Sequence, residues 1–203
     1  MSQSRLTDEE YIPPPELIEA WEEHPEIVKI GDPVLRKVAM PVTRILTSET
    51  QQLIERMKVV MKKANGLGLA APQIGVSRRV IVYSIEDVVR VIVNPIISGG
   101  RGEQLDPPEG CLSIPGLQGR VSRYNELRVR GQDHRGKPVS KRVTEMEARV
   151  IQHEVDHLDG ILFIDRADPE TVVWAYSDDD EDEYDDVEAP HDETALPAKS
   201  ESQ

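Results

Sequence analysis

The stretch at residues 152–160, Gln-His-Glu-Val-Asp-His-Leu-Asp-Gly, constrains the fold more than any other part of the chain. Its histidines, His153 and His157, are four residues apart, so on a helix both imidazoles lie on one face and can share a metal ion. Met146 and Val150 continue this face upstream at helical spacing, which indicates that the histidines point into the core. Two interpretations are open: a metal-hydrolase centre, or two buried histidines that are hydrogen-bonded to their neighbours.

The length and the N-terminal residues bear on the class of protein. The chain has 203 residues, which suits one domain of ordinary size with extensions. No apolar run approaches the length of a membrane helix, and residues 1–10 resemble neither a secretory signal nor a transit peptide. We therefore expect a soluble cytoplasmic protein without membrane association. The single cysteine, Cys111, excludes an internal disulfide and is either buried packing or part of the chemistry.

Acidic residues are concentrated near the C-terminal end. The net charge is -14, but residues 178–203 hold 12 of the 38 acids and one of the 24 bases. The other 26 acids and 23 bases nearly balance, so the chain lacks the basic surface that nucleic-acid binding requires. We predict a partly flexible N-terminal extension (1–26), a catalytic metal-hydrolase domain (27–176) and a disordered acidic tail (177–203), in which His191 is solvated.

Helical periodicity and capping residues predict the helices. We expect a short helix at 16–23, a longer helix at 48–64 and the motif helix from 144 to 159. Ser48 with Gln51, and Thr144 with Glu147, have the spacing of capping boxes at the starts of the two longer helices. Gly160 is expected to end the motif helix, as glycine commonly does.

Alternating and β-branched residues predict the strands. We expect a hairpin of 79–84 with 89–97, a second strand pair of 120–131 with 138–143, and a short strand at 161–164. His134 is expected to be a solvated residue in the turn of the second pair. Residues 27–45 are expected to be extended with little regular structure, and 99–110 to form a loop. Strands followed by one embedded helix indicate the α+β class.

A catalytic metal requires a third protein ligand besides the two histidines. In one protease group the third ligand is a histidine six residues after the second, but Phe163 occupies that position and cannot bind metal. The downstream acids Asp165, Asp168 and Glu170 follow too closely behind the helix end to close the site well. Upstream, Cys111 follows a glycine and offers a thiolate, which a metal both binds and deprotonates.

Three blocks of the chain together resemble the signature motifs of peptide deformylase. They are Gly-Leu-Gly-Leu-Ala-Ala-Pro-Gln at 66–73, Glu-Gly-Cys-Leu-Ser at 109–113 and the stretch at 152–160, in the same order as in that family. The resemblance covers about residues 27–166 and excludes the N-terminal lead and the acidic tail. It implies antiparallel β-sheets around a central metal-binding helix.

The resemblance also implies the activity and the catalytic groups. Cys111, His153 and His157 would hold the metal, and a water would take the fourth position. Glu154 would act as the base. The enzyme would remove the formyl group from the N-terminal formylmethionine of new polypeptides and release formate.

The same resemblance implies how the transition state and the substrate are bound. The Gln73 side-chain amide and the Leu112 backbone N–H would donate to the oxyanion. Gly66 and Gly68 would allow the nascent peptide to pair closely as an added β-strand, although a plain loop after a helix is an alternative for them. The methionine pocket would be apolar, with Leu67, Met146 and Val150 as candidates.

The spacing of the ligands does not identify the metal, and the motifs do not identify the partners. A cysteine with two histidines suits zinc by ligand softness, whereas the family implies Fe²⁺, with Ni²⁺, Co²⁺ or Zn²⁺ able to replace it. Glu109, beside the cysteine motif, is expected to pair with Arg123 or to be exposed. Some relatives contact the ribosome transiently through a C-terminal segment, but phosphate-rich RNA would repel this tail. A monomer is the default for the family.

Two other functions stay open at this point. A zinc endopeptidase is opposed by Phe163 and by the lack of a downstream ligand. A non-catalytic binding protein with a degraded site is opposed by the presence of both Glu154 and Gln73.

Overall fold

The computed structural model describes residue 8, residue 11 and residues 13–175. Its α-helices are α1 (Ile18–Glu22), α2 (Ser48–Lys63) and α3 (Glu145–Leu158). Its strands are β1 (Gly68–Ala70), β2 (Val80–Ile85), β3 (Val88–Arg101), β4 (Glu109–Cys111), β5 (Ile114–Gly119), β6 (Glu126–Gln132), β7 (Pro138–Thr144) and β8 (Val173–Trp174). Short 3-10 helices are η2 (Pro15–Leu17), η3 (Pro33–Arg36), η4 (Ala71–Ile74), η5 (Phe163–Asp165) and η6 (Pro169–Thr171).

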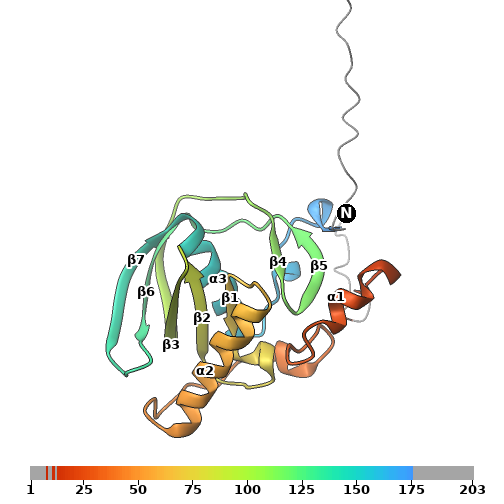
Figure 1. The fold of residues 1–203 in the computed structure, drawn as a ribbon. Coiled ribbons are helices and arrows are strands. Elements are labelled where there is room, and N and C mark those ends of the chain that lie inside the picture. The colour runs from red at the N-terminus through yellow and green to blue at the C-terminus, as the bar shows by residue number, and fades with distance from the viewer. Residues whose placement is uncertain (1–7, 9–10, 12, 176–203) are drawn as a thin grey trace, which may run out of the picture.

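The strands form two antiparallel sheets, as Figure 1 shows. The larger sheet has the order β1-β2-β3-β6-β7, and the smaller one has the order β4-β5-β8. Every pair of neighbouring strands is antiparallel. The predicted α+β class with antiparallel sheets is therefore confirmed. β1 and β4 are edge strands, so each has one side without a strand partner among the described residues.

The larger sheet is packed between α2 and α3. Because successive side chains of a strand point to opposite faces, Val80 and Val82 of β2 pack on the α2 side, whereas Ile81 and Tyr83 pack on the α3 side. All four of these side chains are buried. α3 itself is buried along nearly all of its length from residue 148 to residue 158, which gives the metal motif a dry and rigid setting.

Both expected capping boxes are wrong in detail. The helix at 48 begins where predicted, but its cap is Thr47, whose hydroxyl accepts from the Thr50 N–H at 3.3 Å. At the start of α3 the Thr144 side chain makes no capping bond. The reason is that Thr144 is still part of β7 and pairs with β6, so the chain passes directly from strand into helix. Gly160 follows the end of α3 with a positive φ of 74°, as a helix-ending glycine should.

Several strand boundaries also differ from the expectation. The predicted hairpin forms β2 and β3, and the second predicted pair forms β6 and β7. Residues 120–125 are not part of β6; the backbone of Arg123 pairs instead with Gln104 in an isolated bridge, and its side chain meets buried carboxylates. β3 continues to Arg101 and β4 begins at Glu109, so the predicted loop at 99–110 shortens to 102–108. Residues 161–164 form no strand; the chain turns there into η5.

Two expectations about the ends of the chain have a limited outcome. The predicted tail at 177–203, with His191, lies outside the described residues. Most of the predicted N-terminal extension from residue 13 onward is described, and it contains η2 and α1. Among the described helices, none combines the length and the apolar character that crossing a membrane requires.

Candidate active site and metal centre

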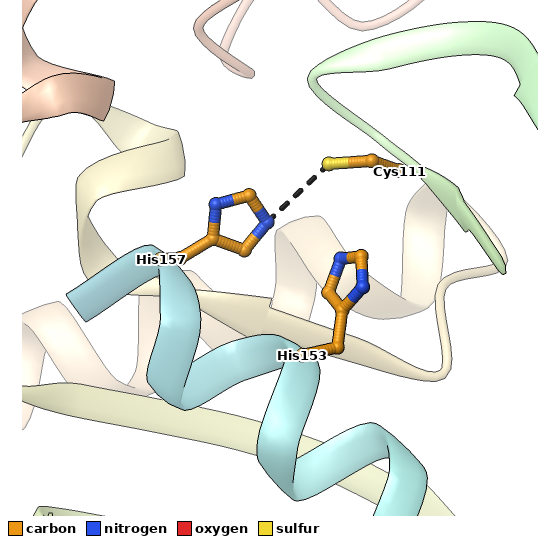
Figure 2. Close-up of side chains that lie close together, drawn as sticks. All are labelled: Cys111, His153 and His157. Atoms are coloured by element: carbon orange, nitrogen blue, oxygen red, sulfur yellow. Dashed lines mark hydrogen bonds between the residues drawn. The ribbon is translucent and has the colours of Figure 1, made fainter. Parts of the chain in front are cut away.

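The three predicted metal ligands converge at the interface of the two sheets. His153 and His157 are one turn apart on α3, and Cys111 reaches them from the end of β4, as Figure 2 shows. Their ligand atoms all lie within 4.8 Å of one another. The Cys111 Sγ is 3.3 Å from the His157 Nε2. The two imidazole rings are 5.0 Å apart at nearly right angles, so their nitrogens can approach one point from two directions.

Gln73 lies in η4 and is almost completely buried, with 1 % of its surface exposed. Its Oε1 accepts from the Ala70 N–H at 2.8 Å, and this bond fixes the orientation of the amide. The Nε2 group therefore points toward the site, where it donates to the Cys111 Sγ at 3.6 Å and to the Ser113 Oγ at 3.4 Å. A surface position for Gln73 is excluded, and its N–H donors are aimed beside the candidate metal ligand.

Glu154 is buried directly beside the ligand set. Its Oε2 has no hydrogen-bond partner among the described residues. Burial raises the pKa of the Glu154 carboxyl to about 7, and the negative charge of Glu109 adds to this effect, while His153 and Arg123 oppose it. A carboxyl with a pKa near 7 can both accept and release a proton at neutral pH, which is what a general base that later acts as an acid requires.

Glu109 connects the ligand set to buried arginines. It accepts two hydrogen bonds of 2.8 Å from Arg123 and one of 2.8 Å from Arg149, and its Oε2 is 2.9 Å from the His153 Nδ1. The predicted Glu109–Arg123 pair is thus confirmed, and the exposed alternative is wrong. Burial acts against the charged Glu109, but the bonds from Arg123 and His153 outweigh it and hold the pKa well below its ordinary value. Since the Nδ1 of His153 is engaged, the Nε2 is left to face Cys111 and His157.

A second buried carboxylate continues this network. Asp156 accepts from the Arg123 Nη1 at 2.5 Å and from the Arg166 Nε at 2.7 Å. Arg123 therefore bridges two carboxylates, and its own side chain is only 4 % exposed. Phe163, which excludes a third histidine ligand, is buried and stacks on the His153 ring with centroids 6.3 Å apart. The outer contacts of His153 are thus an ion pair on one side and an aromatic ring on another.

A cavity of about 440 Å³ opens onto these groups between the two edge strands. Its walls include nearly all of the predicted catalytic and substrate-binding residues, namely Gly66, Leu67, Gly68, Gln73, Cys111, Leu112, Met146, Val150, His153 and Glu154. Val150 is buried and Met146 is partly buried, whereas Leu67 is 56 % exposed and lies at the rim. His157, the third member of the ligand set, is not among the lining residues and is 1 % exposed. The cavity reaches beyond the predicted set to Glu23, His24, Lys29 and Arg149.

Both glycines of the first motif lie where another side chain approaches the backbone closely. A Cβ at Gly66 would be 2.8 Å from the Leu112 Cδ1, and a Cβ at Gly68 would be 2.2 Å from the Glu154 Oε1. These close neighbours are side chains of the site itself, and the pairing of a nascent peptide beside the two glycines stays a prediction. The neighbours are the predicted oxyanion donor and the predicted base.

Sequence reasoning missed three charged residues of the site, Arg149, Asp156 and Lys29. Arg149 and Asp156 lie on α3, which was expected to bury one face, whereas the helix is buried on almost every side. A signal existed for Arg149, because it lies one helical turn before His153. Lys29 carried no local signal, since its place in the cavity results from contacts with residues far away in the chain.

The donor set fits a divalent transition metal. One sulfur and two imidazole nitrogens converge, and the contact of Glu109 with the His153 Nδ1 resembles the outer contact that metal-binding histidines usually make. The cavity on the other side leaves access for water and substrate. The arrangement can therefore support metal-assisted hydrolysis, with Glu154 placed to move protons and Gln73 placed to donate to a developing negative charge.

A family model described as polypeptide deformylase matches residues 24–172. A curated peptide deformylase of Heliobacterium modesticaldum is 50% identical over 143 residues, which are 70% of this chain and 93% of the relative. One from Acidothermus cellulolyticus is 49% identical over 140 residues, covering 69% of this chain and 77% of the relative.

Solved structures with the same fold include peptide deformylases. The peptide deformylase of Synechococcus elongatus, solved in complex with actinonin, has a TM-score of 0.68 and 40% identity over 71% of this chain and 80% of its own. The peptide deformylase of Thermotoga maritima has a TM-score of 0.68 and 40% identity over 70% of this chain and 97% of its own.

Proposed function

This chain belongs to the peptide deformylase family and removes the formyl group from newly made polypeptides, and we propose that the cavity between β1 and β4 is where it does so. The observation that carries the assignment is the convergence of Cys111, His153 and His157 beside the buried Glu154 and Gln73. The residues upstream of 27 and the acidic tail are proposed to be extensions of a catalytic domain at 27–176.

Cys111, His153 and His157 would hold the metal. The ion supplies Lewis acidity and makes a water molecule acidic enough to ionise near neutral pH. The protein orients the ligands: Glu109 contacts the His153 Nδ1 at 2.9 Å, and Arg123 and Arg149 hold Glu109 in place. We infer that these outer contacts preserve the geometry of the site during turnover.

The remaining groups handle protons and charge. Glu154 accepts a proton from the attacking water and passes it to the nitrogen of the leaving amine as the C–N bond of the formyl amide breaks. The Gln73 Nε2 and the Leu112 backbone N–H donate to the oxygen of the formyl group as it becomes negative. Formate and a free N-terminal methionine leave the site.

The two edge strands suggest how the peptide is held. β1 and β4 both border the cavity, and each has an open edge that can hydrogen-bond to an extended chain. We infer that the nascent peptide adds as a strand beside Gly66 and Gly68. Met146 and Val150 then offer an apolar surface for the methionine side chain, with Leu67 at the rim.

We propose Fe²⁺ as the native metal, with Zn²⁺, Ni²⁺ or Co²⁺ able to replace it. A thiolate-bound ferrous site is sensitive to oxidation, because its cysteine sulfur can be oxidised stepwise. Metal analysis of protein purified without air tests this assignment. Iron near one atom per chain, with activity that declines in air, is the expected result; zinc in the anaerobic protein and air-stable activity would contradict it.

Formate release from formyl-Met-Ala by the iron-loaded protein tests the activity. Glu154→Gln and Cys111→Ala should each remove most of the activity, the first with the metal retained and the second with the metal lost. Glu126→Gln, on β6 and not among the residues that line the cavity, is a matched control for the glutamate. Cleavage of internal peptide bonds, or wild-type activity in Glu154→Gln, would overturn the mechanism.

The cellular setting is also proposed. The substrates are formylmethionyl nascent peptides, so we place the enzyme in the cytoplasm, acting as a monomer with transient access to the ribosome. Residues 178–203 carry 12 acids and one base, which disfavours direct contact with RNA. Truncation at Ser177 should therefore leave co-sedimentation with ribosomes unchanged. Loss of co-sedimentation would assign the tail a binding role.

A further inference from the structure

The segment before the first motif is docked firmly on the smaller sheet. Figure 1 shows α1 beside β5. The Trp21 Nε1 donates to the Pro115 carbonyl at 3.0 Å. Leu17 is buried and packs on Gly116, where a Cβ would come within 2.5 Å of the Leu17 Cδ1. The end of α1 is therefore held in one position relative to the cavity wall formed by Pro115 and Gly116.

The segment that follows α1 contacts two of the catalytic motifs. Glu23 and His24, just after α1, line the cavity. The Val28 N–H then donates to the Gln73 carbonyl at 2.8 Å, and the Ile30 N–H donates to the Ser113 carbonyl at 2.9 Å. Lys29 is thus placed between two residues that are tied to the backbone of the site.

Lys29 lines the cavity, and its ammonium group has no carboxylate partner among the residues that the structure describes. It donates to the His24 carbonyl at 3.0 Å and to the Ile27 carbonyl at 2.9 Å. An ammonium has three N–H donors, so one remains for a ligand. Burial lowers the pKa of Lys29, and the attraction of Glu26 and Cys111 opposes this, which is consistent with a group partly cut off from water.

Of the described lysine and arginine side chains that line the cavity, Lys29 is the one that forms no ion pair with a carboxylate. Arg149 is paired with Glu109 at 2.8 Å. The Glu23 side chain is 69 % exposed, so solvent screens its charge. His24 buries its Nδ1 without a partner among the described side chains, which adds a second group that can bind a polar ligand if the ring turns.

We propose that Lys29, with His24 beside it, forms a subsite of this cavity that contacts the residues after formylmethionine and favours an acidic side chain there, bound by the Lys29 ammonium. This inference rests on the proposed function of the cavity. The segment that follows α1 is then part of the substrate-binding surface.

Formylated peptides of matched length test the subsite. The kcat/KM values of formyl-Met-Asp-Ala and formyl-Met-Ala-Asp are compared with those of the Asn and Lys versions. Because a partly exposed ion pair contributes up to ~1 kcal/mol, wild type should prefer Asp over Asn about 2- to 5-fold at one of the two positions. The preference should lie in KM, since Lys29 is not among the reacting groups, and it should decrease as ionic strength rises.

In Lys29→Met the kcat/KM of the Asp peptide should fall to about that of the Asn peptide. Lys62 is an exposed lysine of α2 outside the cavity, and Lys62→Met should keep the wild-type preference for Asp. Using the ratio within one variant cancels any general loss of activity. No preference for Asp at either position in wild type, or an unchanged ratio in Lys29→Met, would overturn the subsite. If Lys29→Met fails to fold, the salt dependence of the wild-type ratio decides the question. Failure of the proposed function itself would instead appear as no formate release from formyl-Met-Ala.

Discussion

Gly68 and Glu154 approach each other so closely that a Cβ atom at position 68 would be 2.2 Å from the Glu154 Oε1. It would also be 2.8 Å from the Glu154 Cγ, so the carboxylate could not escape by rotating its end alone. Glu154 is buried and has little space to move. The glycine of β1 therefore determines where the proposed base can be.

Gly68→Ala should lower kcat by roughly 10²-fold, because even a small displacement of a catalytic group greatly lowers the rate. Metal content should stay near that of wild type, since the ligands are on α3 and β4. Steady-state kinetics with metal analysis on the same sample measures both. A variant with full kcat would show that Glu154 can relax, and that its position is not set by β1.

Removing the Gln73 amide should reduce kcat with little effect on KM. Loss of one oxyanion donor costs about 10²- to 10³-fold, and Gln73→Glu retains the acceptor for the Ala70 N–H while placing a negative charge where the oxyanion forms. Ser113→Ala removes only a partner of the amide and should have a much smaller effect. An equal loss in the Ser113 and Gln73 variants would argue for a structural role of the amide.

Glu109→Gln should weaken both metal binding and the fold. It leaves Arg123 and Arg149 short of a buried anion, and breaking such a pair typically costs about 3–5 kcal/mol of unfolding free energy. Loss of the contact to His153 should lower metal affinity by about 10- to 100-fold. Chelator competition and urea unfolding measure these two effects. Glu126→Gln, which disturbs the exposed pair with Arg142, should change stability by less than ~1 kcal/mol.

The metal-free protein should lose stability between about pH 4.5 and pH 7 because of Glu154. Its pKa is raised by burial from 4.5 to about 7, so the folded state favours the protonated form. The associated stability is fully present below the unfolded pKa and is lost as pH rises through the folded pKa, by up to about 3 kcal/mol. Glu154→Gln should remove this dependence, so its advantage over wild type should grow toward alkaline pH. If the unfolding free energies of the two proteins change with pH in the same way across this range, the assignment is contradicted.

The main features of the active site could be predicted from the sequence, because they are local. The spacing of His153 and His157 sets both rings on one helical face whatever surrounds the helix. Phe163 excluded a downstream histidine, and the motif containing Cys111 indicated an upstream ligand. The strand pairs β2–β3 and β6–β7 were predictable for the same reason, since alternation and turn residues act over short distances.

The sequence predicted the ends of some helices and strands wrongly. Thr144 has the sequence of a cap, but its backbone stays in the β7 ladder, so tertiary pairing overrides the capping preference. Residues 120–125 have the composition of a strand, but the backbone of Arg123 pairs with Gln104 and not with β3. In both places a contact distant in the sequence outweighs the local propensity.

The sequence by itself indicated the candidate metal ligands, the candidate base and the class of fold. Only the tertiary structure decided which charges surround them: Arg149 and Asp156 turn inward because α3 is buried on nearly all sides, and Lys29 reaches the cavity because Val28 and Ile30 are tied to Gln73 and Ser113. The physical reason is the distance along the chain over which each interaction acts. Helical and strand periodicities repeat within a few residues, whereas the partners of a buried charge are set by packing between segments that can be more than forty residues apart.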